Sequence, residues 1–190
     1  RPLALRPGHA GAYNNLGVVL RGLGDVEAAL DAFGKAVALN GNFAEARSNL
    51  GLALKHQRRN AEAATAFREA IALRPDFVEA RYNLAEVLRA TGERREAIAE
   101  MRSVLALAPT FPGAHNQLGN LLADAGRAAE AIAAYQQAIA LSAEDAAAHL
   151  NLGIALREKR LLAEAAVSIR RALELRPDDA RAHEALGETL

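Results

Sequence analysis

Apolar side chains in this chain follow two periods at once. Over short distances Leu16 and Leu20 lie four residues apart, and Ala29, Phe33 and Ala36 follow at intervals of four and three, which indicates one apolar face on each of two α-helices. Over long distances the whole pattern returns every 34 residues. A fixed period of this length is typical of a solenoid built from repeated helix pairs.

The long period is carried by columns of equivalent residues. The first helix of each unit carries an Asn-Leu-Gly motif, from Asn15-Leu16-Gly17 to its last equivalent, Ala185-Leu186-Gly187. The second helix carries small alanines, a bulky residue and a leucine, and we expect these constant positions to form the packing of the fold. The bulky column and the leucine column are Phe33, Phe67, Met101, Tyr135 and Ile169, then Leu39, Leu73, Leu107, Leu141 and Leu175.

Glycine recurs inside the first helix, where it costs about 1 kcal/mol relative to alanine. Five such residues need a steric reason. We expect them to let the first helix lie close against the second, opposite a small alanine, with the bulky column filling the space alongside. They are Gly17, Gly51, Gly119, Gly153 and Gly187.

Turn residues separate the helices. Gly24, Gly92 and Gly126 can take the left-handed conformation that ends a helix, whereas Arg58 and Arg160 replace that glycine and predict strained or differently shaped turns. Two helix starts resemble capping boxes, because a polar residue is followed three positions later by glutamate. These pairs are Asn42 with Glu45 and Asp76 with Glu79.

The period divides the chain into a single array. We expect residues 1–9 to be the tail of a preceding second helix and residues 180–190 to be the first helix of a sixth unit. Because neither end has the polar capping unit that an array needs, we expect a fragment of a larger protein, or alternatively end-to-end self-association through the open faces. The complete units are expected at 10–43, 44–77, 78–111, 112–145 and 146–179.

The order of motifs resembles the tetratricopeptide repeat: Asn-Leu-Gly, then Leu, Gly, Ala, an aromatic residue, Ala, Leu and Pro. The resemblance covers nearly the whole chain. It implies an all-α fold, a right-handed superhelical solenoid of antiparallel helix-turn-helix repeats. In such a superhelix the first helices line a concave groove, so the resemblance implies that residues binding a peptide or extended protein segment lie on the first helices.

Composition narrows the partners. The chain has 23 Lys and Arg against 23 Asp and Glu, so its zero net charge favours neither nucleic acid nor an anionic membrane surface. The absence of cysteine excludes disulfides and thiolate metal sites and is compatible with a reducing, cytoplasmic location. Apolar stretches fall far short of the roughly 20 residues that span a bilayer. We therefore expect a soluble protein with no cofactor, whose partner is a protein or peptide.

The asparagine of the motif is the first candidate for binding. Helices pack about 8–10 Å apart and an extended peptide rises about 3.3 Å per residue, so one carboxamide could meet the peptide backbone about every third residue. A carboxamide both donates and accepts, which suits a peptide group. The alternative is that these amides bond a neighbouring repeat and serve the fold. The column is Asn15, Asn49, Asn83, Gln117 and Asn151.

This column resembles the peptide-binding superhelix of O-linked N-acetylglucosamine transferases, although Gln117 departs from it. Positions beside the column are expected to set specificity. They are Asn14, Ser48, Tyr82, Asn116 and Leu150, and one turn later Val18, Leu52, Glu86, Asn120 and Ile154.

One helical turn further along the first helices, the equivalent residues are mostly basic. They predict a basic stripe that would select acidic peptides. Its alternative is an ordinary solvated helix end, since cations near a helix C-terminus are stabilising. Ala123 interrupts the stripe, whose members are Arg21, Lys55, Arg89 and Arg157.

The sequence gives little support for a metal site, a carboxylate clamp or a catalytic site. His115, His149 and His183 also recur, but columns about 10 Å apart cannot share a metal that binds nitrogen at about 2.0 Å, so we expect packing. Asn116, Asn120, Asn151 and Arg181 partly resemble a carboxylate clamp, but Asn116 and Ala185 stand where the clamp needs cations. No nucleophile elbow, phosphate loop, zinc motif or dinucleotide fingerprint occurs.

The sequence therefore predicts a non-catalytic scaffold that binds a peptide or extended segment in the groove of the first helices. Two alternatives remain open. The chain could be the substrate-recognition arm of a transferase, or a scaffold that assembles with itself through its open ends.

Overall fold

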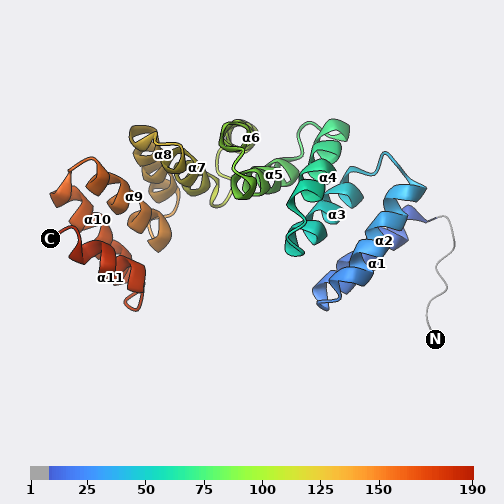
Figure 1. Cartoon of the computed structure of the whole chain (residues 1–190), viewed down its shortest axis with the longest axis horizontal. Coiled ribbons are helices and arrows are strands. Elements are labelled where there is room, and N and C mark those ends of the chain that lie inside the picture. Colours follow the sequence, from blue (N-terminus) through green and yellow to red (C-terminus); the bar gives the residue numbers. More distant parts are fainter. Residues whose placement is uncertain (1–8) are drawn as a thin grey trace. The chain divides into compact units, whose positions relative to one another are not determined.

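The computed structural model describes residues 9–190, and the expected tail of a preceding helix at residues 1–9 lies outside them except for His9. Every regular element among these residues is an α-helix (Figure 1). The helices alternate between first and second helices of successive pairs, so the expected all-α repeat solenoid is confirmed.

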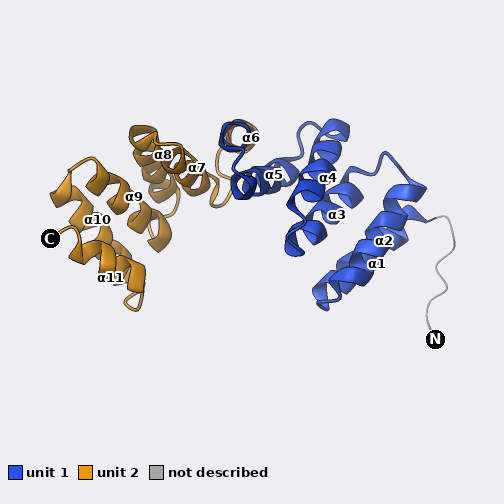
Figure 2. Ribbon diagram, in the orientation of Figure 1, with its two compact units in different colours: residues 1–100 blue, residues 101–190 orange. Residues whose placement is uncertain are grey.

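The chain divides within α6 into two compact units, residues 1–100 and residues 101–190 (Figure 2). The helices of unit 1 are α1 (Ala10–Gly22), α2 (Val26–Leu39), α3 (Ala44–His56), α4 (Asn60–Leu73), α5 (Val78–Thr91) and the beginning of α6 (Arg94–Leu107). Unit 2 holds the end of α6, then α7 (Ala114–Asp124), α8 (Ala128–Leu141), α9 (Ala146–Glu158), α10 (Leu162–Leu175) and α11 (Ala180–Gly187).

The core of each unit joins consecutive helix pairs. In unit 1, Phe33 of α2 packs with Ala29 and with Ala53 of α3. In unit 2, Ile169 of α10 packs with Leu150 of α9, and Ala182 and Ala185 of α11 complete the same cluster. A pair of helices therefore buries its apolar side chains partly against the next pair, as expected of a stacked array.

The recurring glycines admit the bulky column, as the sequence predicted. A Cβ atom added to Gly17 would lie 2.6 Å from the Phe33 ring, and one added to Gly119 would lie 2.3 Å from the Tyr135 ring. The bulky side chain lies directly over the glycine, and at Gly153 the carbonyl oxygen of Ala165 also lies 3.1 Å from an added Cβ. Gly187 has no facing atom within 4 Å among the described residues.

All five turns within the helix pairs have the same shape. Gly24, Gly92 and Gly126 have φ of 84°, 87° and 73°, and Arg58 and Arg160 take the same left-handed conformation with φ of 58° and 62°. In each turn the next N–H donates to a carbonyl five residues earlier, for example Arg59 to Leu54 at 3.0 Å. The arginine turns are therefore strained without being reshaped, because a side chain in this region is unfavourable.

The helix caps differ from the prediction. Helices α3 and α5 start after Phe43 and Phe77, which give no side-chain cap, so the capping boxes expected at Asn42 and Asp76 were wrong. Both polar residues stand one position too early. Asp25, Asp145 and Asp179 do cap helices with their side chains, at the starts of α2, α9 and α11.

The leucine column is less buried than expected of packing positions: four of its five members are exposed, and Leu175 is half-buried. Leu39, Leu73, Leu107 and Leu141 are between 40% and 52% exposed. Each is the last residue of its second helix, so no further helical turn covers it.

Helix α7 begins later in its repeat than the other first helices. Helices α1, α3, α5, α9 and α11 keep the 34-residue spacing of their first residues, which would start α7 at Pro112, but it begins at Ala114. Gly113 precedes it with φ of 73°. The Pro112-Gly113 sequence therefore adds a turn at the place where the other repeats already continue as helix.

Candidate functional site

The predicted site residues lie on the first helices, and in unit 1 two of these helices are joined by an amide pair. The side-chain N–H of Asn49 on α3 donates to the Asn14 side-chain oxygen on α1 at 2.9 Å. Both side chains are half-buried, while Asn15 beside them is exposed. The Oδ1 of Asn49 and the Nδ2 of Asn14 have no hydrogen-bond partner among the described residues. The pair thus keeps an acceptor oxygen on Asn49 and a donor nitrogen on Asn14.

Unit 2 repeats this pair in the same register. The side-chain N–H groups of Asn151 on α9 donate to Asn116 and to Asn120, both on α7 and both at 3.0 Å. The Oδ1 of Asn151 accepts no hydrogen bond from the residues that the structure describes. Asn151 therefore presents an acceptor, as Asn49 does in unit 1.

Asn120 holds the centre of a polar network in unit 2. Its oxygen accepts from the Tyr135 hydroxyl at 2.9 Å as well as from Asn151, and its N–H donates to Gln117 at 3.4 Å. The ring of Tyr135 lies over Gly119, so this network also fixes the packing of α8 on α7. The three amides that partly resemble a carboxylate clamp are brought together here, but they bond one another.

Asn83 differs from the other members of its column. Its N–H donates to the Glu79 carbonyl on its own helix at 2.8 Å, and its oxygen accepts from Lys55 at 3.1 Å. Lys55 also forms an ion pair with Glu86. Tyr82 lies half-buried next to Asn83 on the same helix. Between α3 and α5, these side chains therefore already form a hydrogen bond and an ion pair with one another.

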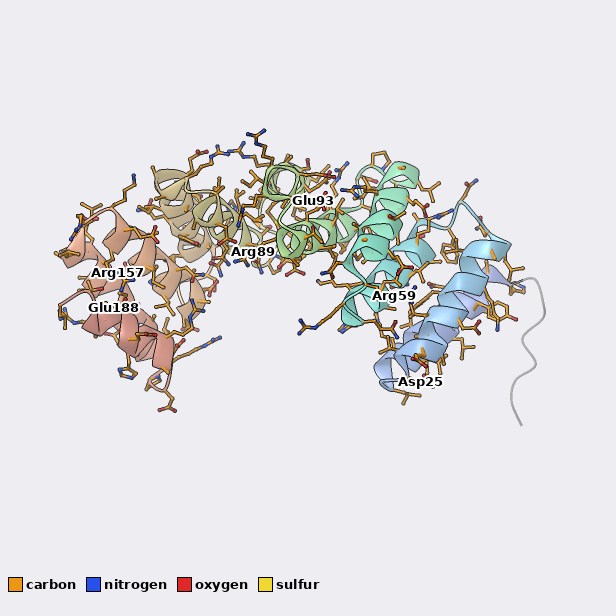
Figure 3. The ribbon with its side chains drawn as sticks, viewed as in Figure 1. Asp25, Arg59, Arg89, Glu93, Arg157 and Glu188 are labelled. Carbon is orange, nitrogen blue, oxygen red and sulfur yellow. The ribbon has the colours of Figure 1, made fainter. Side chains whose placement is uncertain are left out.

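The predicted basic stripe is partly neutralised. Lys55 pairs with Glu86, and Arg157 pairs with Glu188 in the same register, 31 residues further along the chain (Figure 3). Arg21 forms no ion pair within residues 9–190, and Arg89 is exposed in the last turn of α5. Lys55 and Arg157 thus each carry a matched acid.

Two positions expected to set specificity are instead part of the fold. Ser48 and Leu150 are 5% and 3% exposed, and Leu150 packs on the α10 and α11 core. They stand where Asn14 and Asn116 make the amide pairs, so the same position serves either packing or the surface. Val18 is exposed, whereas Leu52 and Ile154 are half-buried.

The histidine column fastens the loops between repeats. A ring nitrogen of His115 lies 3.0 Å from the Pro109 carbonyl, and His149 and His183 make the same contact with the carbonyl six residues earlier. Arg47 and Arg81 donate to the equivalent carbonyls of Gly41 and Pro75. This column therefore needs a side chain that can reach back to the loop and donate a hydrogen bond.

Ion pairs between second helices were not found by the sequence analysis. Arg68 pairs with Glu96 at 2.9 Å in unit 1, and Arg102 pairs with Glu130 at 3.0 Å in unit 2, in the same register. Arg127 also bonds Glu130, and this bond is the main reason that the pKa of Glu130 is lowered from its ordinary value. The 28-residue spacing of arginine and glutamate was the available sequence signal.

No helix in the described part of the chain is both long and apolar enough to cross a membrane. Within the same residues, no three histidine, aspartate or glutamate side chains group in a way that could hold a metal ion.

Comparison with known families identifies the repeats. Sequence profiles described as tetratricopeptide repeat match residues 3–45, 14–76, 54–121 and 146–179, and one described as TPR repeat matches residues 119–159. Together they cover nearly the whole array. No curated protein matches the chain in sequence.

Solved structures share the fold. MamA from Desulfovibrio magneticus RS-1 is 27% identical with a TM-score of 0.83, and the match covers 90% of this chain and 97% of that one. YrrB, described as a TPR protein with an unusual peptide-binding site, is 24% identical with a TM-score of 0.83, over 94% of this chain and 92% of its own.

Proposed function

Because the chain belongs to the tetratricopeptide repeat family, we propose that its first helices bind an extended polypeptide segment through the peptide backbone. Proteins of this fold generally bind proteins or peptides and are typically scaffolds without catalysis. The description of YrrB as a protein with a peptide-binding site supports this proposal. It does not identify the residues, which must be argued from this chain.

The observation that carries the proposal is the pair of asparagines on adjacent first helices. In unit 1 the bond between Asn49 and Asn14 leaves the Asn49 oxygen and the Asn14 amide nitrogen without partners on half-buried side chains. A peptide group offers the complementary N–H and oxygen. The bond also restrains both side chains before a ligand arrives, which reduces the ordering cost of binding.

Unit 2 supports the same role for Asn151. Its two N–H bonds to Asn116 and Asn120 hold the carboxamide in place and leave its oxygen available as an acceptor. Asn83 is a weaker candidate, because its amide is already bonded to Glu79 and Lys55. We therefore assign the backbone contacts to Asn49 with Asn14 and to Asn151, and a supporting role to Asn83.

Charge is expected to contribute little to the choice of ligand. Lys55 and Arg157 are each paired with a glutamate, so a ligand carboxylate would have to displace an existing partner. Exposed ion pairs contribute only about 0–1 kcal/mol, which leaves a modest role for Arg21. We expect selected ligands to have no strong acidic bias.

Peptide selection tests this function directly. Peptides from a random library are selected on the immobilised full chain, and each is then resynthesised with single alanine substitutions and with single N-methylated peptide bonds. N-methylation removes the backbone donor, so it is expected to weaken binding about fivefold or more at one or two positions. If N-methylation has no effect while alanine substitutions abolish binding, side-chain recognition replaces the proposed backbone mode.

Self-association is a second candidate, favoured by an exposed apolar face on α1. Val19 is 58% exposed, although its equivalents Ala53, Val87 and Leu121 are buried. Leu16 and Leu23 lie on the same face and are exposed as well. Light scattering across a hundredfold concentration range tests this candidate, and a constant monomer mass would rule it out.

A further inference from the structure

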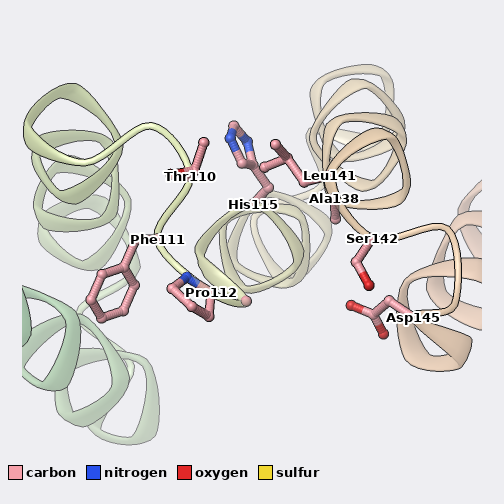
Figure 4. A pocket seen from close by; sticks show the side chains of 9 residues that line it. Thr110, Phe111, Pro112, His115, Ala138, Leu141, Ser142 and Asp145 are labelled. Atoms are coloured by element: carbon pink, nitrogen blue, oxygen red, sulfur yellow. The ribbon is translucent and has the colours of Figure 1, made fainter.

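Unit 2 contains a pocket of about 420 Å³ on the loop side of the repeats (Figure 4). It lies between the loop that precedes α7 and the loop that joins α8 to α9. Its walls include Pro112, Gly113 and Leu141, and its polar groups include Ser142 and Asp145. None of these residues belongs to the first-helix asparagine column, so the pocket is independent of the proposed peptide contacts.

At the equivalent place in unit 1, an ion pair joins the two segments. Arg74, in the loop after α4, bonds Glu45 in the first turn of α3 at 2.6 Å. The guanidinium of Arg74 also lies 3.5 Å from the centre of the Phe77 ring. An arginine side chain therefore fills the space between two successive loops of unit 1.

Different residues at the equivalent positions, two repeats further along the chain, explain why the pocket is open in unit 2. The residue equivalent to Glu45 is Gly113, and the residue equivalent to Arg74 is Ser142. Both long side chains of the ion pair are thus replaced by small ones. Phe77, on which the guanidinium rests in unit 1, corresponds to Asp145. The space remains, and a carboxylate now stands beside it.

The side chains that line the space suit a guanidinium group. One oxygen of Asp145 accepts the Ala148 N–H at 3.0 Å, which fixes the carboxylate, and the other oxygen has no partner among the described residues. Figure 4 shows Ser142 and Asp145 directed toward one another on one side of the pocket, across from Pro112. The apolar walls formed by Pro112 and Leu141 can cover an aliphatic stem.

We propose that this pocket binds an arginine side chain from a partner polypeptide. The guanidinium lies between the Asp145 carboxylate and the Ser142 hydroxyl and takes the place that Arg74 occupies in unit 1. Its planar fork of donors can reach both groups at once, whereas the single ammonium of lysine reaches them less well. An acidic ligand would lie against Asp145 and is disfavoured.

Titration of the ¹⁵N-labelled full chain with N-acetyl-arginine amide, followed by NMR, tests the proposal. Saturable shifts are expected at residues 110–115 and 138–146, with a dissociation constant in the millimolar range typical of one side chain. N-acetyl-lysine amide is expected to bind more weakly, and N-acetyl-glutamate amide to cause no shifts there. The proposal fails if the glutamate probe binds in the pocket or if the arginine probe leaves these residues unshifted.

Two variants and a matched control locate the binding groups. Asp145→Asn keeps a side chain that caps α9 well and is expected to weaken binding of the arginine probe at least about fivefold. Ser142→Arg is expected to abolish it, because the chain's own guanidinium then occupies the pocket. Asp179→Asn makes the same change at the cap of α11, away from the pocket, and should bind as the unaltered chain does. Equal binding by the Asp145→Asn variant would overturn the proposal, whatever its melting temperature.

Discussion

Asn49 donates a hydrogen bond to Asn14 on the neighbouring first helix, and each amide retains an unused group at the surface. Asn151 makes the corresponding bond to Asn116. The choice between a structural and a binding role for the asparagine column is therefore too simple. The same carboxamide bonds a neighbouring repeat with its N–H and can present its oxygen to a ligand.

The glycines of the first helix should tolerate no side chain where a ring lies over them. For Gly119→Ala we expect a loss of about 1–3 kcal/mol in the free energy of unfolding, because the added Cβ lies 2.3 Å from the Tyr135 ring. Gly34→Ala is the matched control, since Gly34 is inside α2 with nothing within 4 Å. The control should gain up to about 1 kcal/mol. Chemical denaturation measures both, and equal effects would refute the steric account.

The left-handed arginines should be sites of relievable strain. For Arg58→Gly and Arg160→Gly we expect a gain of about 0.5–1 kcal/mol in unfolding free energy, because glycine adopts a positive φ at little cost. The greater freedom of glycine in the unfolded chain offsets part of the gain. Gly92→Ala, at the equivalent turn, should destabilise by about 1 kcal/mol. Thermal or chemical unfolding that shows Arg58→Gly to be less stable than the parent would contradict this prediction.

The pKa of Glu130 should change when either of its arginine partners is replaced. The hydrogen bond from Arg127 is the largest cause of the lowered pKa, and Arg102 contributes less. Arg127→Gln should therefore raise the pKa of Glu130 toward its ordinary value, and Arg102→Gln should raise it by a smaller amount. Carboxyl ¹³C NMR titration measures these shifts, and a larger effect of Arg102→Gln would show that the order of contributions is wrong.

The lowered pKa of Glu130 also determines how its contribution to stability changes with pH. Because the folded pKa of Glu130 is depressed, its contribution to stability is present above the pKa of the unfolded chain and is lost as the pH falls through the folded pKa. The side chain is exposed, so the contribution should be small and should decrease with added salt.

Much of the fold could be predicted because its determinants are local and repeated. The apolar positions around Leu16 and Phe33 define the helix pairs, and the cost of glycine in a helix already indicated the close approach at Gly17. Helix starts were less accessible, since Asn42 and Asp76 have the chemistry of a cap but stand one residue before it. The exposed leucines show the same limit, because a periodic apolar residue at a helix end need not be covered.

The sequence predicted where the candidate binding residues lie, but it could not predict which hydrogen bonds they form. The sequence indicates the column that contains Asn49, Asn83 and Asn151, but only the structure shows that Asn83 is bonded to Lys55 while the other two retain a free oxygen. The loop pocket could not be predicted from the sequence either. The small side chains of Gly113 and Ser142 indicate an open space only once the structure shows that their equivalents in unit 1 form an ion pair.

The affinity of the Asn49→Ala/Asn151→Ala double variant for a selected peptide tests the central claim most directly. Gln137→Ala, on the exposed surface of second helix α8, serves as the control. We predict that the double variant binds about fivefold to tenfold more weakly, while its melting temperature falls by no more than about 4–8 °C. Unchanged affinity together with a larger loss of melting temperature would show that these asparagines serve the fold alone and would contradict the account.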